Sequence, residues 1–197
     1  MVYQPYSSHE EDAVLVRAYR TGDEQSFALL LNKHLGAVYS FVFQLVQDRA
    51  AAEDVVQEVF VKAWRHLGRF DVTRPFRTWL FAIAKNSAYD WLKKKRAIPF
   101  SAFAIDEAEE PFENIPDTEP LPNELLIQEG VVHEVREAVA CLHEPYRSLM
   151  VLVYQEGFSL HEASEVLGES YNTVKSRHQR AIARLRQRFT MDASKNQ

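Results

Sequence analysis

The sequence predicts an all-α protein made of two small helical domains joined by a flexible linker. Apolar residues recur every three or four positions in both halves, for example at Val56, Phe60, Ala63 and Leu67. This spacing places an apolar stripe along one face of a helix, which can then pack in a core. No segment shows the two-residue alternation with hairpin turns that indicates a β-sheet. The pattern therefore favours helical bundles throughout.

A segment rich in acids and prolines divides the chain. Five of the eight prolines lie between positions 99 and 122, and proline interrupts both helices and central strands. The segment 97–125 also holds eight acidic residues and no Lys or Arg. We therefore expect domains at residues 10–97 and 125–190, with 98–124 as an acidic, proline-rich linker. Because the whole chain has a net charge of −5, the remainder is net positive, which suits a nucleic-acid partner.

Composition narrows the classes of function. The N-terminus is polar and acidic and lacks the basic start and apolar block of a secretory signal, so the cytoplasm is the expected compartment. No run reaches the ~20 continuous apolar residues of a membrane-spanning helix. Cys141 is the only cysteine, which excludes a disulfide within the chain and a multi-cysteine metal site. The six glycines are isolated from one another and form no phosphate-binding loop.

A helix-turn-helix is predicted within residues 157–188. Ser159 and Glu162 have the spacing of a capping box, in which each side chain bonds the backbone N–H of the other residue. The helix that they begin is expected to end at Leu167, because Gly168 suits the left-handed conformation after a helix end. Two helices joined by such a tight turn form the unit that places its second helix in the major groove of DNA.

The second helix of this unit is expected to contact DNA. Either Ser170 or Asn172 can cap its N-terminus, and it runs to about Phe189. It carries six Lys and Arg residues and no acid, although a merely solvated basic helix is the alternative. Lys and Arg can pair with guanine and Gln with adenine, whereas the later arginines suit phosphates. The predicted DNA-binding residues are Thr173, Lys175, Ser176, Arg177, Gln179, Arg180 and Arg184.

These residues resemble a known family. The run 157–168, followed by 173–177, is similar to the second DNA-binding domain of bacterial sigma factors. In the N-terminal half, residues 52–60, 76–80 and 83–86 resemble the first sigma domain. Two such domains in this order, with only a short linker between them, resemble the extracytoplasmic-function (ECF) subfamily. The resemblance implies a sigma factor that binds core RNA polymerase and directs it to promoter DNA, with no cofactor and no small-molecule substrate.

A few positions depart from the family pattern. His178 stands where an aliphatic residue is usual, so the packing of the recognition helix is expected to differ. Ala163 and Ser164 replace a more apolar pair, and Glu169 and Ser170 replace a common Ile-Pro. These differences bear on promoter preference and leave the class unchanged.

One N-terminal helix is expected to dock on the polymerase. Its acidic and amide side chains lie beside an apolar face, an arrangement that suits a basic helical partner. The resemblance implies that this partner is the coiled coil of the polymerase clamp, and a solvated acidic face is the alternative. The predicted core polymerase-binding residues are Glu53, Asp54, Gln57 and Glu58.

Basic and aromatic residues are interleaved farther along the N-terminal half. A positive surface with aromatic platforms holds single-stranded DNA, and an extruded base requires a shaped pocket. By resemblance, the loop 69–75 and Asn86 form that pocket at the −10 element. Trp79, Leu80 and Trp91 are expected in the core rather than facing DNA. The predicted −10 DNA-binding residues are Arg69, Arg74, Arg77, Lys85, Asn86 and Lys93.

The resemblance implies further contacts. The helix 131–142, with Tyr146, Leu149 and Met150, is expected to pack the C-terminal domain and to offer an apolar contact to the polymerase flap. The acidic linker either enters the positively charged polymerase channel or serves as a solubilising tether. Members of the subfamily are commonly inhibited by an anti-sigma factor, often at the membrane, so such a partner is expected.

Three other classes of function fit the sequence less well. An enzyme would need convergent reactive groups, and the only His/Cys cluster, His133, Cys141 and His143, follows a patterned helix and matches no nucleophile motif. A conventional transcription regulator would share the helix-turn-helix but lack the polymerase-docking motifs. An interaction adaptor would not need a basic helix of this kind. A non-enzymatic initiation factor accounts for all of these features.

Overall fold

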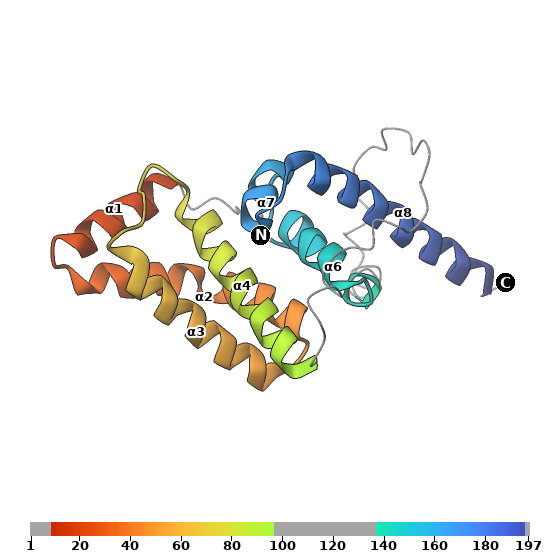
Figure 1. Ribbon diagram of the computed structural model, residues 1–197, viewed down its shortest axis with the longest axis horizontal. Coiled ribbons are helices and arrows are strands. Elements are labelled where there is room, and N and C mark those ends of the chain that lie inside the picture. Colours follow the sequence, from red (N-terminus) through yellow and green to blue (C-terminus); the bar gives the residue numbers. More distant parts are fainter. Residues whose placement is uncertain (1–8, 97–136, 196–197) are drawn as a thin grey trace.

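The computed structural model describes residues 9–96 and 137–195, which form helices and turns without any strand among them. The predicted all-α fold is therefore confirmed, and the predicted linker lies outside the described residues. The N-terminal domain forms one bundle, coloured red to green in Figure 1. Its helices are α1 (His9–Arg20), α2 (Glu24–Val46), α3 (Arg49–Leu67) and α4 (Phe76–Arg96).

Side-chain caps mark the starts of two helices in this bundle. Asp23 accepts a hydrogen bond from the backbone N–H of Gln25 at the start of α2, at 3.1 Å. Asp48 does the same for α3 through the N–H of Ala51, also at 3.1 Å. Such caps satisfy N–H groups that have no partner inside the helix. Between the two helices, Gln47 adopts the left-handed conformation (φ 56°), so α2 turns directly into α3.

The core of the bundle is built around α2. Its Val38, Phe41 and Leu45 are fully buried, and α2 packs against α1, α3 and α4. Phe41 meets Phe81 of α4 with ring centroids 5.3 Å apart. By length and composition α2 could also cross a membrane, with a mean hydropathy of 1.2 in its most apolar window. Its place at the centre of the bundle accounts for this apolar character.

The described part of the C-terminal domain consists of short helices followed by a long one. They are α6 (Glu144–Met150), a π-helical turn η3 (Val151–Gln155), α7 (Leu160–Leu167) and α8 (Tyr171–Lys195). Tyr146 and Met150 pack in one apolar cluster with Ala181, Ile182 and Leu185 of α8. In Figure 1, α8 extends from this cluster away from the N-terminal bundle.

The two domains pack directly against each other. α7 lies against α4, and α6 lies against α2 (Figure 1). Phe81 of α4 meets Phe158, which precedes α7, at a centroid distance of 5.0 Å, and both belong to one core cluster. The sequence predicted two bundles on a tether and gave no indication of this shared core, because the contacting residues lie far apart in the chain.

Candidate polymerase-docking and nucleic-acid interfaces

The predicted polymerase-docking residues share one exposed side of α3. Glu53, Asp54, Gln57 and Glu58 are all exposed, as their spacing of one and four residues predicts. Glu53 pairs with Arg49 at 3.2 Å, and Glu58 pairs with Lys62 at 2.7 Å. Exposed pairs of this kind contribute little to stability, so these carboxylates remain accessible to a partner.

An apolar groove of about 530 Å³ borders this acidic row. It lies between α2 and α3, and its large side chains are unusually open to solvent: Trp64 is 53% exposed and Val61 is 44% exposed. Exposed apolar grooves rimmed by charge mark surfaces for other macromolecules. Because Gln57 belongs to both features, the acidic row and the groove form one continuous surface. The groove is lined by Phe27, Leu31, Leu35, Val56, Gln57, Phe60, Val61 and Trp64.

The predicted −10 residues divide into an open and an occupied group. Arg69, Arg74 and Asn86 are exposed. Arg77 and Lys85 are partly buried and hydrogen-bonded to the C-terminal domain. Arg74 also lies 3.9 Å from Glu165 of that domain, but its side chain is 66% exposed. Lys93 is partly buried near the C-terminal end of α4. The structure therefore places the open group on the α3–α4 loop and on one face of α4.

Arg77 bridges the two domains. Its Nη2 donates to the backbone carbonyl of Glu156 and lies 3.3 Å from the Glu156 Oε2. The guanidinium also stacks on Phe158, 4.1 Å from the ring centroid. The Glu156 side chain is buried, and this burial raises its pKa although Arg77 opposes the rise. In this arrangement the Arg77 guanidinium is paired with the Glu156 carboxylate.

Lys85 is held by the end of α7. Its Nζ donates to the carbonyl of Leu167 at 3.1 Å, a group left without an intrahelical partner at the helix C-terminus. Burial lowers the pKa of Lys85. Nearby, the Tyr89 hydroxyl hydrogen-bonds that of Ser148 at 3.0 Å. One face of α4 is thus covered by the C-terminal domain.

The aromatic residues of α4 support the N-terminal core. Leu80 is fully buried, and Trp79, Ile83 and Trp91 are partly buried and packed against the core cluster. Trp79 also contacts Phe70 at a centroid distance of 4.8 Å. The expectation that these side chains pack inside rather than face DNA agrees with their positions.

The helix-turn-helix forms at the predicted residues, although α8 runs on to Lys195, beyond the expected end near Phe189. Ser159 and Glu162 make both hydrogen bonds of the capping box at the start of α7. Gly168 follows α7 with φ 73°, in the left-handed region that favours glycine. Of the two predicted caps for α8, Ser170 is the one used, because its Oγ accepts from the Thr173 N–H at 3.1 Å.

The N-terminal half of α8 presents most of the predicted DNA-binding residues. Thr173, Lys175 and Arg180 are exposed, and Ser176 and Gln179 are partly exposed. The opposite stripe, which includes Val174, Ala181 and Leu185, is buried. The helix therefore has one face in the core and one face exposed to solvent.

Two predicted residues of α8 have protein partners instead. Arg177 is 4% exposed and forms an ion pair with Glu169 at 2.6 Å, so it is not available to DNA in this conformation. Arg177 lies three residues after the buried Val174 and therefore on the same inward face of α8, toward the α7–α8 junction. Arg184 stacks 4.4 Å over the ring of Tyr146.

The environment of His178 could not be read from the sequence. This residue, which departs from the family pattern, stacks on Tyr154 of η3 at an interplanar angle of 13° and shares a 3.0 Å hydrogen bond with it. Burial lowers the pKa of His178. The π-helical turn that presents Tyr154 has no sequence signature. The altered packing expected at this position therefore takes the form of a ring stack with a hydrogen bond.

The residues predicted to contact the polymerase flap are buried in this structure. Tyr146, Leu149 and Met150 are buried, so they pack the C-terminal domain as expected but form no exposed surface for the polymerase flap. Each of them lies in an apolar cluster with other buried residues.

Glu144 is a second residue without a sequence signal. It begins α6 and is buried, and this burial raises its pKa to about 7. Four neighbouring groups lower this pKa and so oppose the effect of burial: Tyr89, Arg147, Arg177 and Lys85. These groups come from α4, α6 and α8, so Glu144 lies where the two domains meet.

Among the described residues, no group of His, Cys, Asp and Glu has the arrangement of a metal site. Cys141 is exposed, and His133 lies outside the described residues.

Family comparisons agree with this organisation. Residues 30–98 match the model for sigma-70 region 2, and residues 133–185 match that for sigma-70 region 4. The RNA polymerase sigma-H factor of Pseudomonas aeruginosa is 32% identical over 88% of this chain and 91% of its own length. The ECF RNA polymerase sigma factor SigL of Mycobacterium tuberculosis is 31% identical over 80% and 85%, respectively.

The chain belongs to the ECF sigma factors of RNA polymerase. As a sigma factor it binds core RNA polymerase and directs promoter-specific initiation of transcription. The solved structure of CnrH in complex with the cytosolic domain of CnrY aligns with a TM-score of 0.67 and 28% identity, covering 92% of this chain and 99% of that chain. RpoE of Bartonella quintana, solved with the anti-sigma factor NepR, aligns at 0.61 and 25%, covering 85% and 99%.

Proposed function

We propose that this sigma factor uses three surfaces to initiate transcription, two in a domain spanning 10–97 and one in a domain spanning 125–190. The acidic row of α3 and its apolar groove bind the coiled coil of the polymerase clamp. The loop 69–75 and the basic face of α4 open the −10 element. The N-terminal half of α8 reads the −35 element.

The observation that carries the polymerase-docking assignment is the continuity of charge and apolar surface on α3. A basic helical partner can place its charges against Asp54 and Glu58 while its apolar side chains enter the groove beside Trp64. Core positions of such interfaces are apolar and aromatic, with polar groups around them. Charge complementarity then selects the partner and its orientation.

Reversal of the acidic row tests this assignment. Asp54→Arg combined with Glu58→Arg should abolish binding to core polymerase and promoter-specific run-off transcription, with the fold retained. Glu10→Arg combined with Glu24→Arg makes the same change in net charge at exposed positions on α1 and α2 and should leave both activities intact. Unchanged capture of core polymerase by the α3 variant would refute the assignment.

The −10 assignment is supported by exposed polar groups on the α3–α4 loop and midway along α4. Arg69 and Arg74 on the loop can contact phosphates, and exposed Asn86 can hydrogen-bond the edge of an extruded base. Arg77 and Lys85 reach DNA only when the C-terminal domain leaves α4, since both are bonded to it here. Promoter opening therefore requires the domains to separate.

Asn86→Ala tests the pocket without changing charge. It should reduce permanganate-detected opening of a promoter much more than it reduces binding to core polymerase, because base capture follows docking. The matched control is Asn32→Ala, which removes an exposed asparagine from α2 and should leave opening unchanged. Equal losses of opening and of polymerase binding in Asn86→Ala would contradict the pocket role.

The −35 assignment rests on the two faces of α8. Lys175 and Arg180 are exposed near the N-terminal end of the helix, where recognition helices contact base edges. The later Arg184 suits a phosphate contact once it leaves the ring of Tyr146. Arg177, paired with Glu169, fixes the junction of α7 and α8 in the present conformation.

An anti-sigma factor is proposed as a further partner. CnrH was solved with the cytosolic domain of CnrY, and the RpoE of Bartonella quintana was solved with the anti-sigma factor NepR. We place the protein in the cytoplasm, held at the membrane when its regulator is membrane-bound, and assign it no enzymatic activity. A regulator encoded by a neighbouring gene should abolish run-off transcription when added in equimolar amount, and unchanged transcription would remove that candidate.

A further inference from the structure

α1 has no role in the assignments above, and it precedes the region 2 match, which begins at residue 30. Its last residue, Arg20, nevertheless reaches across the bundle to the α3–α4 loop. The Arg20 Nη2 donates to the carbonyl of Leu67 at 3.1 Å and also to the carbonyl of Phe70. Figure 1 shows this loop running beside α1 to the start of α4.

The two carbonyls are suited to a guanidinium. Leu67 ends α3, and the last carbonyls of a helix lack intrahelical partners and carry partial negative charge. One planar guanidinium can hold two acceptors in a fixed geometry, whereas an ammonium is a compact point charge. Arg20 therefore fixes the first residues of the loop relative to α3.

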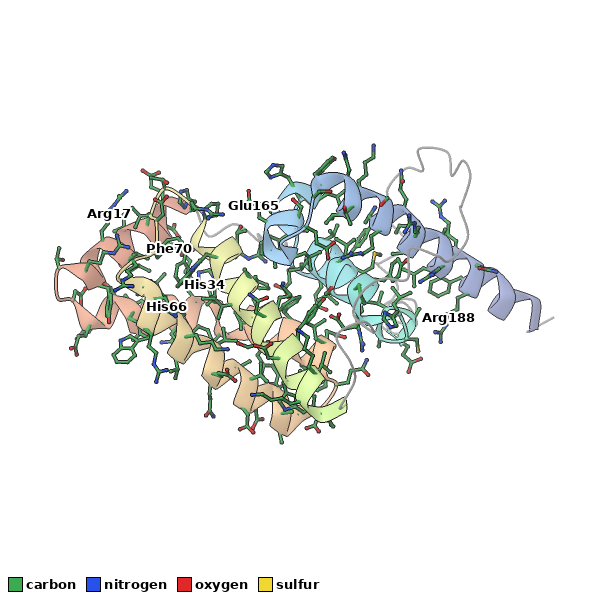
Figure 2. The ribbon with its side chains drawn as sticks, in the orientation of Figure 1. Arg17, His34, His66, Phe70, Glu165 and Arg188 are labelled. Carbon is green, nitrogen blue, oxygen red and sulfur yellow. The ribbon has the colours of Figure 1, made fainter. Side chains whose placement is uncertain are left out.

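Packing and hydrogen bonds fix the rest of the loop. Phe70 is buried and packs against Phe76 and Trp79, with centroid distances of 5.6 and 4.8 Å. Figure 2 labels Phe70 at this end of the bundle. The Asp71 carboxylate then accepts from the N–H and the hydroxyl of Thr73, at 3.0 and 2.7 Å. Arg69 and Arg74 of this loop are exposed, and Arg74 lies 3.9 Å from Glu165 of α7.

α1 is itself anchored at its other end. Asp12 is 1% exposed and lies 2.8 Å from the Nζ of Lys33 and 3.0 Å from the Nε2 of His34, both on α2. The His34 ring in turn contacts Phe76, at a centroid distance of 5.4 Å. α1 is thus held at both ends, which gives Arg20 a fixed starting point.

We propose that Arg20 is a positioning residue for promoter opening, which holds the loop 68–75 in the shape that receives an extruded base. The proposal rests on the assignment of this loop to the −10 element. A base must leave its stack before the pocket can hold it, so a loop that is ordered beforehand adds no further ordering cost at that step. Arg20 itself acts through the loop backbone.

The test uses the full chain with core polymerase on a promoter selected from a random library by the wild-type protein. Arg20→Ala should lower permanganate-detected opening about tenfold at saturating sigma factor, with polymerase binding changed less than about twofold. Preference for the selected −10 sequence over single-base variants should fall in parallel. Arg20→Lys should recover only part of the opening and of the sequence preference, because lysine keeps the charge but lacks the planar guanidinium that bonds two carbonyls.

Two variants separate this role from a loss of fold or of general charge. Arg17→Ala removes an exposed arginine from the same helix and should leave opening unchanged. Asp71→Ala loosens the loop from its other side and should reproduce the Arg20→Ala defect. Opening by Arg20→Ala within about twofold of wild type would overturn the proposal, as would full rescue by Arg20→Lys.

The proposed pocket is tested separately by Asn86→Ala. Reduced opening in Asn86→Ala with normal opening in Arg20→Ala would refute the role of Arg20 and leave the pocket in place. Normal opening in both variants would refute the assignment of the loop to the −10 element, and the role of Arg20 with it.

Discussion

Arg77 joins the two domains through a buried carboxylate, and its removal should reveal how much that contact contributes. Arg77→Met retains much of the aliphatic chain but leaves the Glu156 carboxylate, 2% exposed, without its cation. Loss of one partner from a buried pair costs about 3–5 kcal/mol. Because the Arg77 side chain is 18% exposed, we expect the lower end, about 3 kcal/mol, in the free energy of unfolding.

A double-mutant cycle measured by urea denaturation isolates the pair. Glu156→Gln removes the charge, so its combination with Arg77→Met should recover much of the loss, with a coupling energy of about 1–3 kcal/mol. Arg74→Met is the control, because Arg74 lies 3.9 Å from Glu165 and is 66% exposed, so its loss should be below about 1 kcal/mol. Additive losses within about 0.5 kcal/mol would show that the Arg77–Glu156 pair does not form in solution.

Two further predictions concern single residues. Burial raises the pKa of Glu144 from 4.5 to about 7, so the folded state binds this proton more tightly than the unfolded chain does. The contribution of Glu144 to the free energy of unfolding is fully present below pH 4.5 and is lost as the pH rises through about 7. The total loss is about 3 kcal/mol at most. Glu144→Gln should flatten that part of the profile of unfolding free energy against pH, and an unchanged slope would contradict the assignment. Ser159→Ala removes the cap of α7 and should lower the free energy of unfolding, measured by thermal denaturation, by about 1 kcal/mol. An unchanged free energy would show that the cap does not contribute to stability.

Local signals in the sequence predicted the helix-turn-helix closely. The capping pair Ser159 and Glu162 and the left-handed Gly168 act on their own few residues, so their effect is visible without the rest of the fold. Apolar spacing likewise predicted the buried stripe of α8, including Val174 and Ala181. The sequence left the cap of α8 open, and the structure assigns it to Ser170.

The burial of charged residues could not be predicted in this way. Arg77 and Lys85 have the sequence context of DNA-binding residues, yet their partners Glu156 and Leu167 lie 79 and 82 positions away. Arg177 has a nearby partner in Glu169, but only the packing of α8 decides that it turns inward.

The sequence by itself determined the helical fold class, the capping box of α7, the helix-turn-helix and the resemblance to the family, because each depends on short-range periodicity or on a local motif. Tertiary structure decided which basic residues are exposed, that Arg20 bonds the α3–α4 loop, and that the two domains share a core around Phe81 and Phe158. These depend on contacts between distant segments, where a side chain's exposure is set by what packs against it.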